Sequence, residues 1–388
     1  MTNLPQPEAE ALAQSRQLLD LIRAEIKTAG GWISFARYME MALYTPHWGY
    51  YTSSSKKFGA SGDFVTAPEM TPLFGQTLAN QLYPLMQESA PCLVEAGAGS
   101  GLLAVDVLQA LEQMNALPQD YFIMEISPGL RQTQAGTLAE KVPHLLSRVR
   151  WLDALPDGFR GVVFANELLD AIPVRLLVSR HDGLFERGVG LNEHHELQFA
   201  DVPADRELAG YAAQLTLPAS DTMDYVTEFH PGAARWVTTQ AERLQQGAIL
   251  LIDYGYPRAE YYLPNRAQGT IQCYYRHHVH NDLLLWPGLN DITSFIDFTA
   301  IAEAGYDAGM DVLGYTSHAH FLLNCGLLDA LEKRNAPESA DYIRAAQAVK
   351  RLTSLNDTGE LFKVLLLGKN ITNLPALGFS RGDRLFSL

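Results

Sequence analysis

The chain has 388 residues, of which 47% are hydrophobic and 19% are charged, and this composition is ordinary for a globular protein. Its length suits two to three domains, or one domain with large insertions. The net charge of −15 argues against nucleic acid or an anionic membrane as the main partner, because both attract clustered Lys and Arg. A cationic partner suits this negative net charge better.

The cysteine spacing and the lack of long apolar runs narrow the class of protein further. The cysteines, Cys92, Cys273 and Cys325, lie far apart and form no CxxC pair, so neither a disulfide framework nor a zinc knuckle is expected. No apolar run approaches the length of a membrane span, and the acidic start M-T-N-L-P-Q-P-E-A-E lacks the core of a signal peptide. We therefore expect a cytoplasmic enzyme that does not bind membranes.

The first 90 residues are predicted to form a helical cap and a lid. Apolar residues at helical spacing predict helices over 8–29 and 34–43, and Thr71 with Pro72 begins another that reaches about 87. The segment between the second and third helices is rich in aromatic residues and turn formers. Its composition favours an ordered lid.

Residues 91–388 are predicted to form the main domain, since strand and helix patterns alternate there. Repeated βα units indicate a mostly parallel sheet that binds its ligands beyond the carboxyl ends of the strands. The pattern is interrupted at about 175–225 and 254–293, which we interpret as insertions, the first with hairpin strands. Strands are expected at 93–96, 121–126, 149–152, 161–165, 248–253, 310–314 and 361–368, and a helix near 318–333.

The stretch L-V-E-A-G-A-G-S-G-L-L, residues 93–103, predicts a strand, a tight glycine turn and the start of a helix. A dinucleotide fingerprint would need a small residue at Leu102, so the turn argues against a dehydrogenase. The pattern E-x-G-x-G-x-G resembles the first motif of class I S-adenosylmethionine (SAM) methyltransferases. The predicted cofactor contacts in this motif are Glu95, Gly97, Ala98, Gly99 and Gly101.

Polar residues follow the next strands at the same edge of the predicted sheet. Glu125 ends the second strand, where a carboxylate would bind both ribose hydroxyls, although NAD enzymes share that position. Ile126 is assigned to the cofactor site with it, and Asp153, with Ala154, is placed to accept a bond from the adenine amino group. Asn166 follows the fourth strand and would contact cofactor or acceptor. Taken singly, each acid could equally be a solvated loop carboxylate.

With these residues in place, the chain resembles the MidA-like family of SAM-dependent methyltransferases. The resemblance runs from about Gly49 to Gly368 and rests on ordered motifs that include G-D-F-V-T-A-P-E, V-E-A-G-A-G-S-G, M-E-I-S-P-G-L-R and N-E-L-L-D-A-I-P-V-R. It implies an α/β fold of class I, with a Rossmann-like seven-stranded sheet whose last strand is antiparallel. It also implies SAM as cofactor, S-adenosylhomocysteine as product, and transfer of methyl groups to an arginine of a protein partner.

An arginine acceptor must be held and must lose a proton, and carboxylates suit both tasks. Glu167 and Asp170, directly after the fourth strand, are the first candidates, followed by Asp63 in the lid. His277 is a candidate base or acceptor contact, and a structural role for it is at least as plausible. Alternatively, Asp170 caps a helix turn and Glu167 is solvated. No H-E-x-x-H pattern occurs, so no metal is expected.

Two other functions fit the same motifs. The protein could be a non-catalytic assembly factor that binds SAM only for structure, or it could methylate a small molecule, because this fold hosts many acceptors. A homodimer is a further expectation. The acceptor is therefore the least specified part of the prediction.

Overall fold

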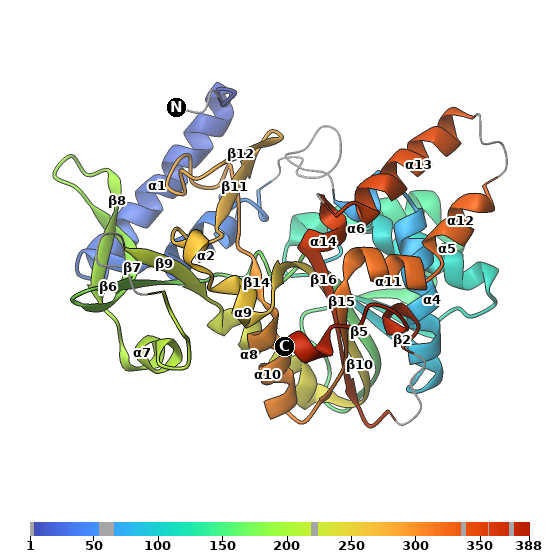
Figure 1. Ribbon diagram of the computed structural model, residues 1–388. Coiled ribbons are helices and arrows are strands. Elements are labelled where there is room, and N and C mark those ends of the chain that lie inside the picture. The colour runs from blue at the N-terminus through green and yellow to red at the C-terminus, as the bar shows by residue number, and fades with distance from the viewer. Residues whose placement is uncertain (1–3, 54–65, 219–223, 335–338, 356, 372–375) are drawn as a thin grey trace. The chain divides into compact units, whose positions relative to one another are not determined.

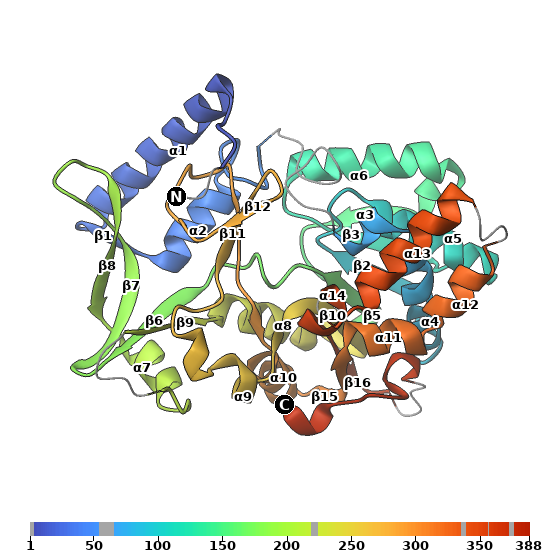
Figure 2. The ribbon, with the colours of Figure 1, turned by 45° about the horizontal axis from the view of Figure 1, so that its top comes forward.

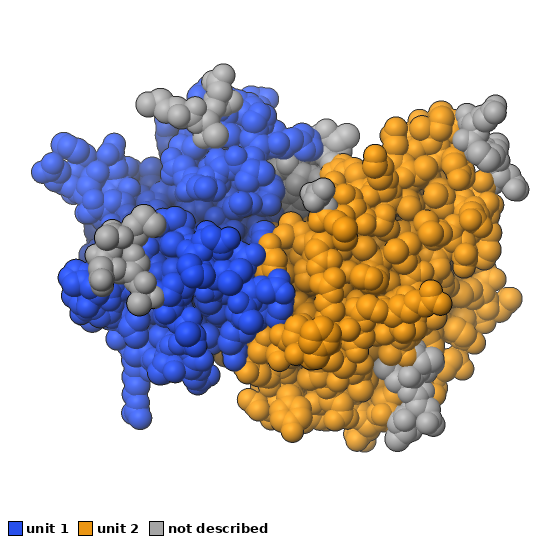
Figure 3. All heavy atoms as spheres, in the orientation of Figure 1, with its two compact units in different colours: residues 1–64, 169–233, 257–297 blue, residues 65–168, 234–256, 298–388 orange. Residues whose placement is uncertain are grey.

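The computed structural model describes residues 4–53, 66–218, 224–334, 339–355, 357–371 and 376–388. The chain forms two compact units, coloured separately in Figure 3. Unit 1 comprises residues 1–64, 169–233 and 257–297, and unit 2 comprises residues 65–168, 234–256 and 298–388.

The expected boundary at residue 90 falls inside unit 2. Helix α4 (Leu73–Gln87), which the sequence placed with the cap, contributes its apolar side chains to the core of unit 2. Phe74, Leu78 and Leu82 are fully buried there. Because these apolar side chains are buried in the core of unit 2, the helix belongs to that unit.

Unit 2 contributes seven described strands to one sheet, in the order β15-β16-β10-β5-β2-β3-β4, of which Figure 1 labels β15, β16, β10, β5 and β2. Strands β4, β3, β2, β5 and β10 run parallel, and β16 is antiparallel to both of its neighbours. The predicted class I sheet, with its last strand antiparallel, is confirmed. The strands are β2 (Cys92–Ala96), β3 (Asp120–Met124), β4 (Val149–Leu152), β5 (Phe159–Asn166), β10 (Leu244–Tyr256), β15 (Asp311–Ser317) and β16 (Phe362–Lys369).

Helices cover both faces of this sheet. Figures 1 and 2 show α4, α5 and α11 on one face, and α10 on the other. The single helix expected at 318–333 is wrong: Gly326, with φ of +86°, separates α11 from α12 in a left-handed turn. The helices are α3 (Ala67–Met70), α5 (Leu102–Gln113), α6 (Pro128–Lys141), α8 (Pro231–Arg243), α10 (Phe298–Asp307), α11 (His318–Asn324), α12 (Leu327–Glu332), α13 (Ala340–Thr353) and α14 (Thr358–Leu361).

Unit 1 is built on antiparallel strands. Strands β6 and β7 form the hairpin expected in the first insertion, and β1, β8 and β9 complete that sheet, while β11, β12 and β13 form a smaller one. The elements of unit 1 are α1 (Ala9–Thr28), β1 (Trp32–Ser34), α2 (Phe35–Tyr44), β6 (Arg175–Arg180), β7 (Gly183–Leu191), β8 (Leu197–Pro203), α7 (Arg206–Ala212), β9 (Tyr225–Phe229), α9 (Arg258–Tyr261), β11 (Gln272–Tyr275), β12 (His278–His280), β13 (Asp291–Thr293) and β14 (Ile296–Asp297).

Strand β2 marks the place in unit 2 where a ligand is expected. From β2 the chain adds β3 and β4 on one side, and β5 and β10 lie on the other. Open parallel sheets bind ligands beyond the carboxyl ends of their strands at such a reversal of strand order. Within the part of the chain that the structure describes, no helix is long and apolar enough to span a membrane.

Candidate active site

The glycine turn directly follows β2 and requires glycine for two physical reasons. Gly97, Gly99 and Gly101 all have positive φ, at +70°, +50° and +85°. A Cβ on Gly97 would also lie 2.9 Å from a methyl carbon of Leu168, and a Cβ on Gly101 would lie 3.1 Å from Cα of Gln134. The turn therefore keeps its shape only without these side chains.

The turn leads into α5, for which Gly101 is the N-cap residue. The first N–H groups of a helix have no partner inside the helix, so they are available to a polar ligand group. Ser100 in the turn donates a 2.5 Å hydrogen bond to Oε1 of Glu69, on the short helix α3. This contact links the A-P-E-M segment to the glycine turn, although the two are distant in sequence.

Glu95, the acidic residue before the turn, is only 2% exposed. Its Oε2 accepts a hydrogen bond from the hydroxyl of Tyr121 on the neighbouring strand β3. Burial raises the pKa of Glu95 to about 7, against the opposing effect of that hydrogen bond. Tyr121 therefore already holds this carboxyl group, and contact between Glu95 and the cofactor stays a prediction.

Glu125 follows β3 and presents a carboxylate that is held at both oxygens. Oε1 accepts from the N–H of Ser127 at 2.8 Å, and Oε2 accepts from the amide nitrogen of Gln134 at 3.0 Å. Burial raises the pKa of Glu125, while these donors act in the opposite direction. Beside it, the apolar side chain of Ile126 is 67% exposed, which suits contact with a flat apolar ligand surface.

Asp153 follows β4 and is the most exposed of the predicted acids that the structure describes, with 94% of its side chain accessible. Arg131 donates to its Oδ1 at 2.6 Å, and also to the carbonyl oxygens of Glu125 and Leu152 at 2.7 and 3.1 Å. Arg131 thus ties the ends of β3 and β4 together. Ala154 is exposed next to this ion pair.

Asn166 and Glu167 form a hydrogen-bonded pair at the end of β5. Nδ2 of Asn166 donates to Oε1 of Glu167 at 3.0 Å, while Oδ1 of Asn166 is buried and accepts no hydrogen bond from the described residues. Glu167 has φ of +53°, and its N–H donates to the carbonyl oxygen of Ile252 at 2.9 Å. Left-handed backbone in a residue with a side chain costs roughly 1–2 kcal/mol and is common at functional sites.

The other catalytic candidates belong to different parts of the chain. Asp170 is buried in unit 1, where its carbonyl oxygen accepts from the N–H of Ser294 at 3.1 Å. His277 is exposed, and with Arg276 it forms the two-residue turn between β11 and β12, where both have positive φ. Asp63 lies outside the described residues. Within the described ranges, no group of three or more His, Cys, Asp or Glu is placed to hold a metal.

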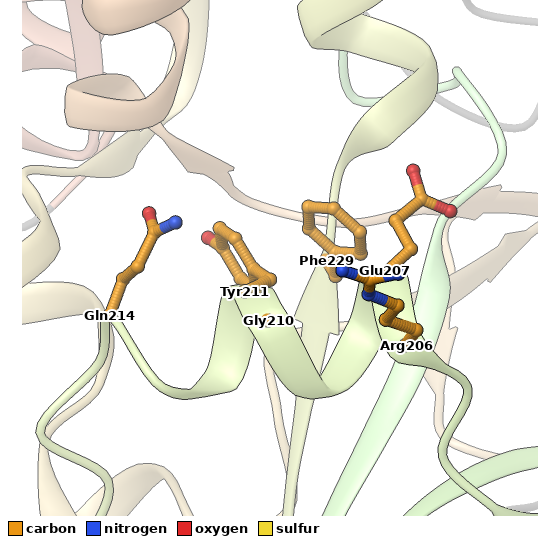
Figure 4. A pocket seen from close by; sticks show the side chains of 6 residues that line it. All are labelled: Arg206, Glu207, Gly210, Tyr211, Gln214 and Phe229. Atoms are coloured by element: carbon orange, nitrogen blue, oxygen red, sulfur yellow. The ribbon is translucent and has the colours of Figure 1, made fainter.

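Unit 1 also carries an open groove, shown in Figure 4, in which the rings of Tyr211 and Phe229 stack with their centroids 4.0 Å apart. None of the predicted site residues that the structure describes lines it. Its lining residues are Arg206, Glu207, Gly210, Tyr211, Gln214 and Phe229.

Residues that hold the predicted site in place were not identified from the sequence. Arg131 and Gln134 lie three apart on α6, and their side chains contact the end of β3. Positions i and i+3 share a helix face, and a polar pair just after the acidic strand end could have suggested this role. Tyr121 offered no such signal, because its partner is far away in the sequence, and Glu69 was noted only as part of the G-D-F-V-T-A-P-E motif.

Comparison with known proteins identifies the family. A protein-family profile described as "Putative S-adenosyl-L-methionine-dependent methyltransferase" matches residues 76–316, more than half of the chain. The chain belongs to this family. The family assignment, SAM as cofactor, and the general class of methyltransferase are therefore confirmed.

Individual relatives extend the match over nearly the whole chain. A crystal structure from Burkholderia thailandensis, bound to S-adenosyl-homocysteine, is 46% identical, covers 100% of both chains and has a TM-score of 0.95. "Protein arginine methyltransferase NDUFAF7, mitochondrial" from Danio rerio is 28% identical and covers 91% of this chain and 90% of its own. The human protein of the same name is also 28% identical, over 88% of this chain and 81% of its own.

Proposed function

We propose that this protein transfers methyl groups from SAM to the guanidinium of an arginine in a protein substrate. The observation that carries the arginine part is the similarity to a protein arginine methyltransferase over 91% of the chain. The negative net charge is compatible with a cationic acceptor.

The residues at the carboxyl edge of unit 2 fit the cofactor. The glycine turn would accommodate its methionine portion together with Glu95 and Ala98, and Glu125 would accept hydrogen bonds from the ribose hydroxyls. The exposed side chain of Ile126 would contact the adenine, whose amino group would donate to Asp153 near Ala154. The buried Oδ1 of Asn166 lacks a hydrogen-bond donor among the described residues, and cofactor or acceptor would supply one.

Bound SAM supplies an electrophilic methyl group on a sulfonium. The nucleophilic nitrogen of the acceptor forms a bond to the methyl carbon as the carbon–sulfur bond breaks, and S-adenosylhomocysteine leaves. The protein contributes mainly by holding the acceptor nitrogen in line with the carbon–sulfur bond. A free guanidinium is always protonated, so the acceptor must also give up a proton.

Glu167 is the residue that we propose for this proton. Its carboxylate is oriented by Asn166 and its backbone is held by Ile252, so it is positioned before the acceptor arrives. A carboxylate can pair with the guanidinium and accept a proton from it. Asp170, Asp63 and His277 remain secondary candidates for contacts with the substrate.

The test uses purified protein, methyl-labelled SAM and a cell extract from the source organism, with the labelled residue located by mass spectrometry. We expect label on arginine in one or a few proteins. Label on lysine or on a small molecule would contradict the arginine proposal. Failure of the protein to bind SAM or S-adenosylhomocysteine by calorimetry would contradict the proposed cofactor site itself.

A further inference from the structure

Gln134 on α6 contacts three parts of the candidate cofactor site at once. It is 0% exposed, and its amide nitrogen donates to the carbonyl oxygen of Gly99 at 3.1 Å and to Oε2 of Glu125 at 3.0 Å. Its amide oxygen accepts from the indole N–H of Trp151 on β4 at 2.9 Å. One side chain thus joins the glycine turn, the end of β3 and the strand β4.

The chemistry of these partners allows only one orientation of the amide. An indole N–H can only donate, and a backbone carbonyl can only accept, so the oxygen must face Trp151 and the nitrogen must face Gly99. In that orientation both amide hydrogens are used, one for Gly99 and one for Glu125. Rotation of the amide by 180° would break all three bonds inside a buried site, which is costly.

The fixed amide of Gln134 gives the Glu125 carboxylate a defined set of hydrogen bonds. Its oxygen Oε1 accepts a hydrogen bond from Ser127 and Oε2 accepts one from Gln134, and the backbone N–H of Ile126 also acts on the carboxylate. A carboxylate offers about four acceptor positions, so these donors leave room for a hydrogen bond from a ligand. A ribose hydroxyl is a donor of the kind that this remaining position suits.

We infer that Gln134 is a positioning residue for cofactor binding, which aims the Glu125 carboxylate at the ribose hydroxyls and holds the glycine turn at the distance that SAM requires. The inference rests on the proposed cofactor site. The close approach of the turn to α6 supports it, since a Cβ on Gly101 would lie 3.1 Å from Cα of Gln134. Trp151 acts in turn on Gln134 by fixing the direction of the amide.

The experiment measures the affinity of S-adenosylhomocysteine and of its 2′-deoxyribose analogue by calorimetry, for the wild-type protein and for Gln134→Met. Methionine fills a similar volume but cannot donate. We expect S-adenosylhomocysteine to bind about 10- to 100-fold more weakly to the variant, as is usual when a hydrogen bond to a charged group is lost. The wild type should discriminate against the deoxy analogue, and the variant should discriminate much less, because its carboxylate is no longer aimed at the hydroxyl.

Gln81→Met is the matched control. Gln81 is equally buried in unit 2, on α4, and its amide oxygen accepts from the N–H of Gly378 at 2.8 Å. This control should lose stability but keep both the affinity and the discrimination of the wild type. Trp151→Phe removes the N–H that orients the amide, together with part of the ring system, and it should show a smaller version of the Gln134→Met effect even if the latter variant folds poorly.

The outcomes separate this inference from the proposed function. If the wild type binds S-adenosylhomocysteine and Gln134→Met keeps full discrimination against the deoxy analogue, Gln134 is only a structural residue and the inference is wrong. The same holds if Gln81→Met weakens binding as much as Gln134→Met does. If the wild type itself fails to bind, the proposed cofactor site is what fails.

Discussion

The amide nitrogen of Asn166 lies 3.0 Å from Oε1 of Glu167, at the point where the chain leaves β5 with Glu167 at φ of +53°. A left-handed residue that carries a long side chain is held there against its own preference. In unit 2, this pair is where we place the chemistry of the acceptor, beside the glycine turn to which we assign the cofactor.

Glu167→Gln should reduce methyl transfer by about a hundredfold or more, because a positioned acid or base commonly contributes that much. The affinity for S-adenosylhomocysteine should stay within a few-fold of the wild type, since Glu167 is assigned to the acceptor. Transfer rates and calorimetry together measure both effects. Glu140→Gln, an exposed change on α6, is the control and should behave as wild type. Full activity in Glu167→Gln would move the proton transfer to another residue.

Glu125→Ala should weaken S-adenosylhomocysteine binding far more than Asp153→Ala does. The Glu125 carboxylate is buried and held at both oxygens, whereas 94% of the Asp153 side chain is exposed and its pair with Arg131 faces water. Exposed ion pairs contribute only about 0–1 kcal/mol, so we expect a loss of a few-fold at most for Asp153→Ala. Calorimetry on both variants checks this order. Equal losses would show that the exposed aspartate binds the adenine more strongly than its surroundings suggest.

We expect the burial of Glu95 to make the stability of the protein depend on pH. Its pKa is raised to about 7 in the folded protein, from an ordinary value of 4.5, because it is buried. Between these values the folded state holds more protons than the unfolded state, so this group's contribution to stability falls as pH rises from about 4.5 to 7.

Glu95→Gln should remove that part of the pH dependence while leaving an acceptor for the Tyr121 hydroxyl. Urea unfolding at pH 5 and pH 8 should show the wild type losing about 2–3 kcal/mol more than the variant over this range. Asp106, whose pKa burial also raises to about 7, titrates in both proteins, so the comparison isolates the part of the slope that depends on Glu95. Parallel pH curves for the two proteins would contradict the buried, protonatable Glu95.

His318 should have the opposite effect. The centroid of its ring lies 5.6 Å from that of Phe74 and 5.6 Å from that of Phe362, and neither ring nitrogen has a hydrogen-bond partner among the described residues. Burial, assisted by the charge of Lys363, lowers its pKa to about 3 from 6.5. Here the unfolded state holds more protons, so stability is lost as pH falls below about 6.5.

His318→Leu should therefore flatten the acid side of the stability curve. Near pH 7.5 the change should be neutral or stabilising, because it removes two unpaired polar atoms from an apolar site. Urea unfolding between pH 5 and 7.5 measures both effects. A loss of several kcal/mol at pH 7.5 would mean that the imidazole has a partner that this site requires.

Local signals were sufficient for much of the fold. The apolar runs of β2, β5, β10 and β16 are recognisable because strands buried on both faces are nearly continuous in hydrophobic residues. The structure divides the single helix expected at 318–333 at Gly326, and the sequence did not show this break because a glycine is tolerated inside a helical pattern as readily as it ends one.

The supporting contacts of the candidate site could not be predicted in the same way. Gln134 meets Gly99 35 positions away and Trp151 17 positions away, and Tyr121 meets Glu95 26 positions away. No periodicity encodes such pairs, since they depend on which strands become neighbours and on how a helix sits against them.

The sequence by itself determined the glycine turn, the acids at successive strand ends and the family, because each rests on residues close together in the chain and on the fixed geometry of a βα unit. Tertiary structure alone decided which of those acids are buried. Glu95 and Glu125 lose water while Asp153 keeps it, and only the packing of α6 and β3 around them makes that difference. Packing against the apolar core of unit 2 likewise decided that α4 belongs to that unit, since a helix joins whichever apolar surface covers its own.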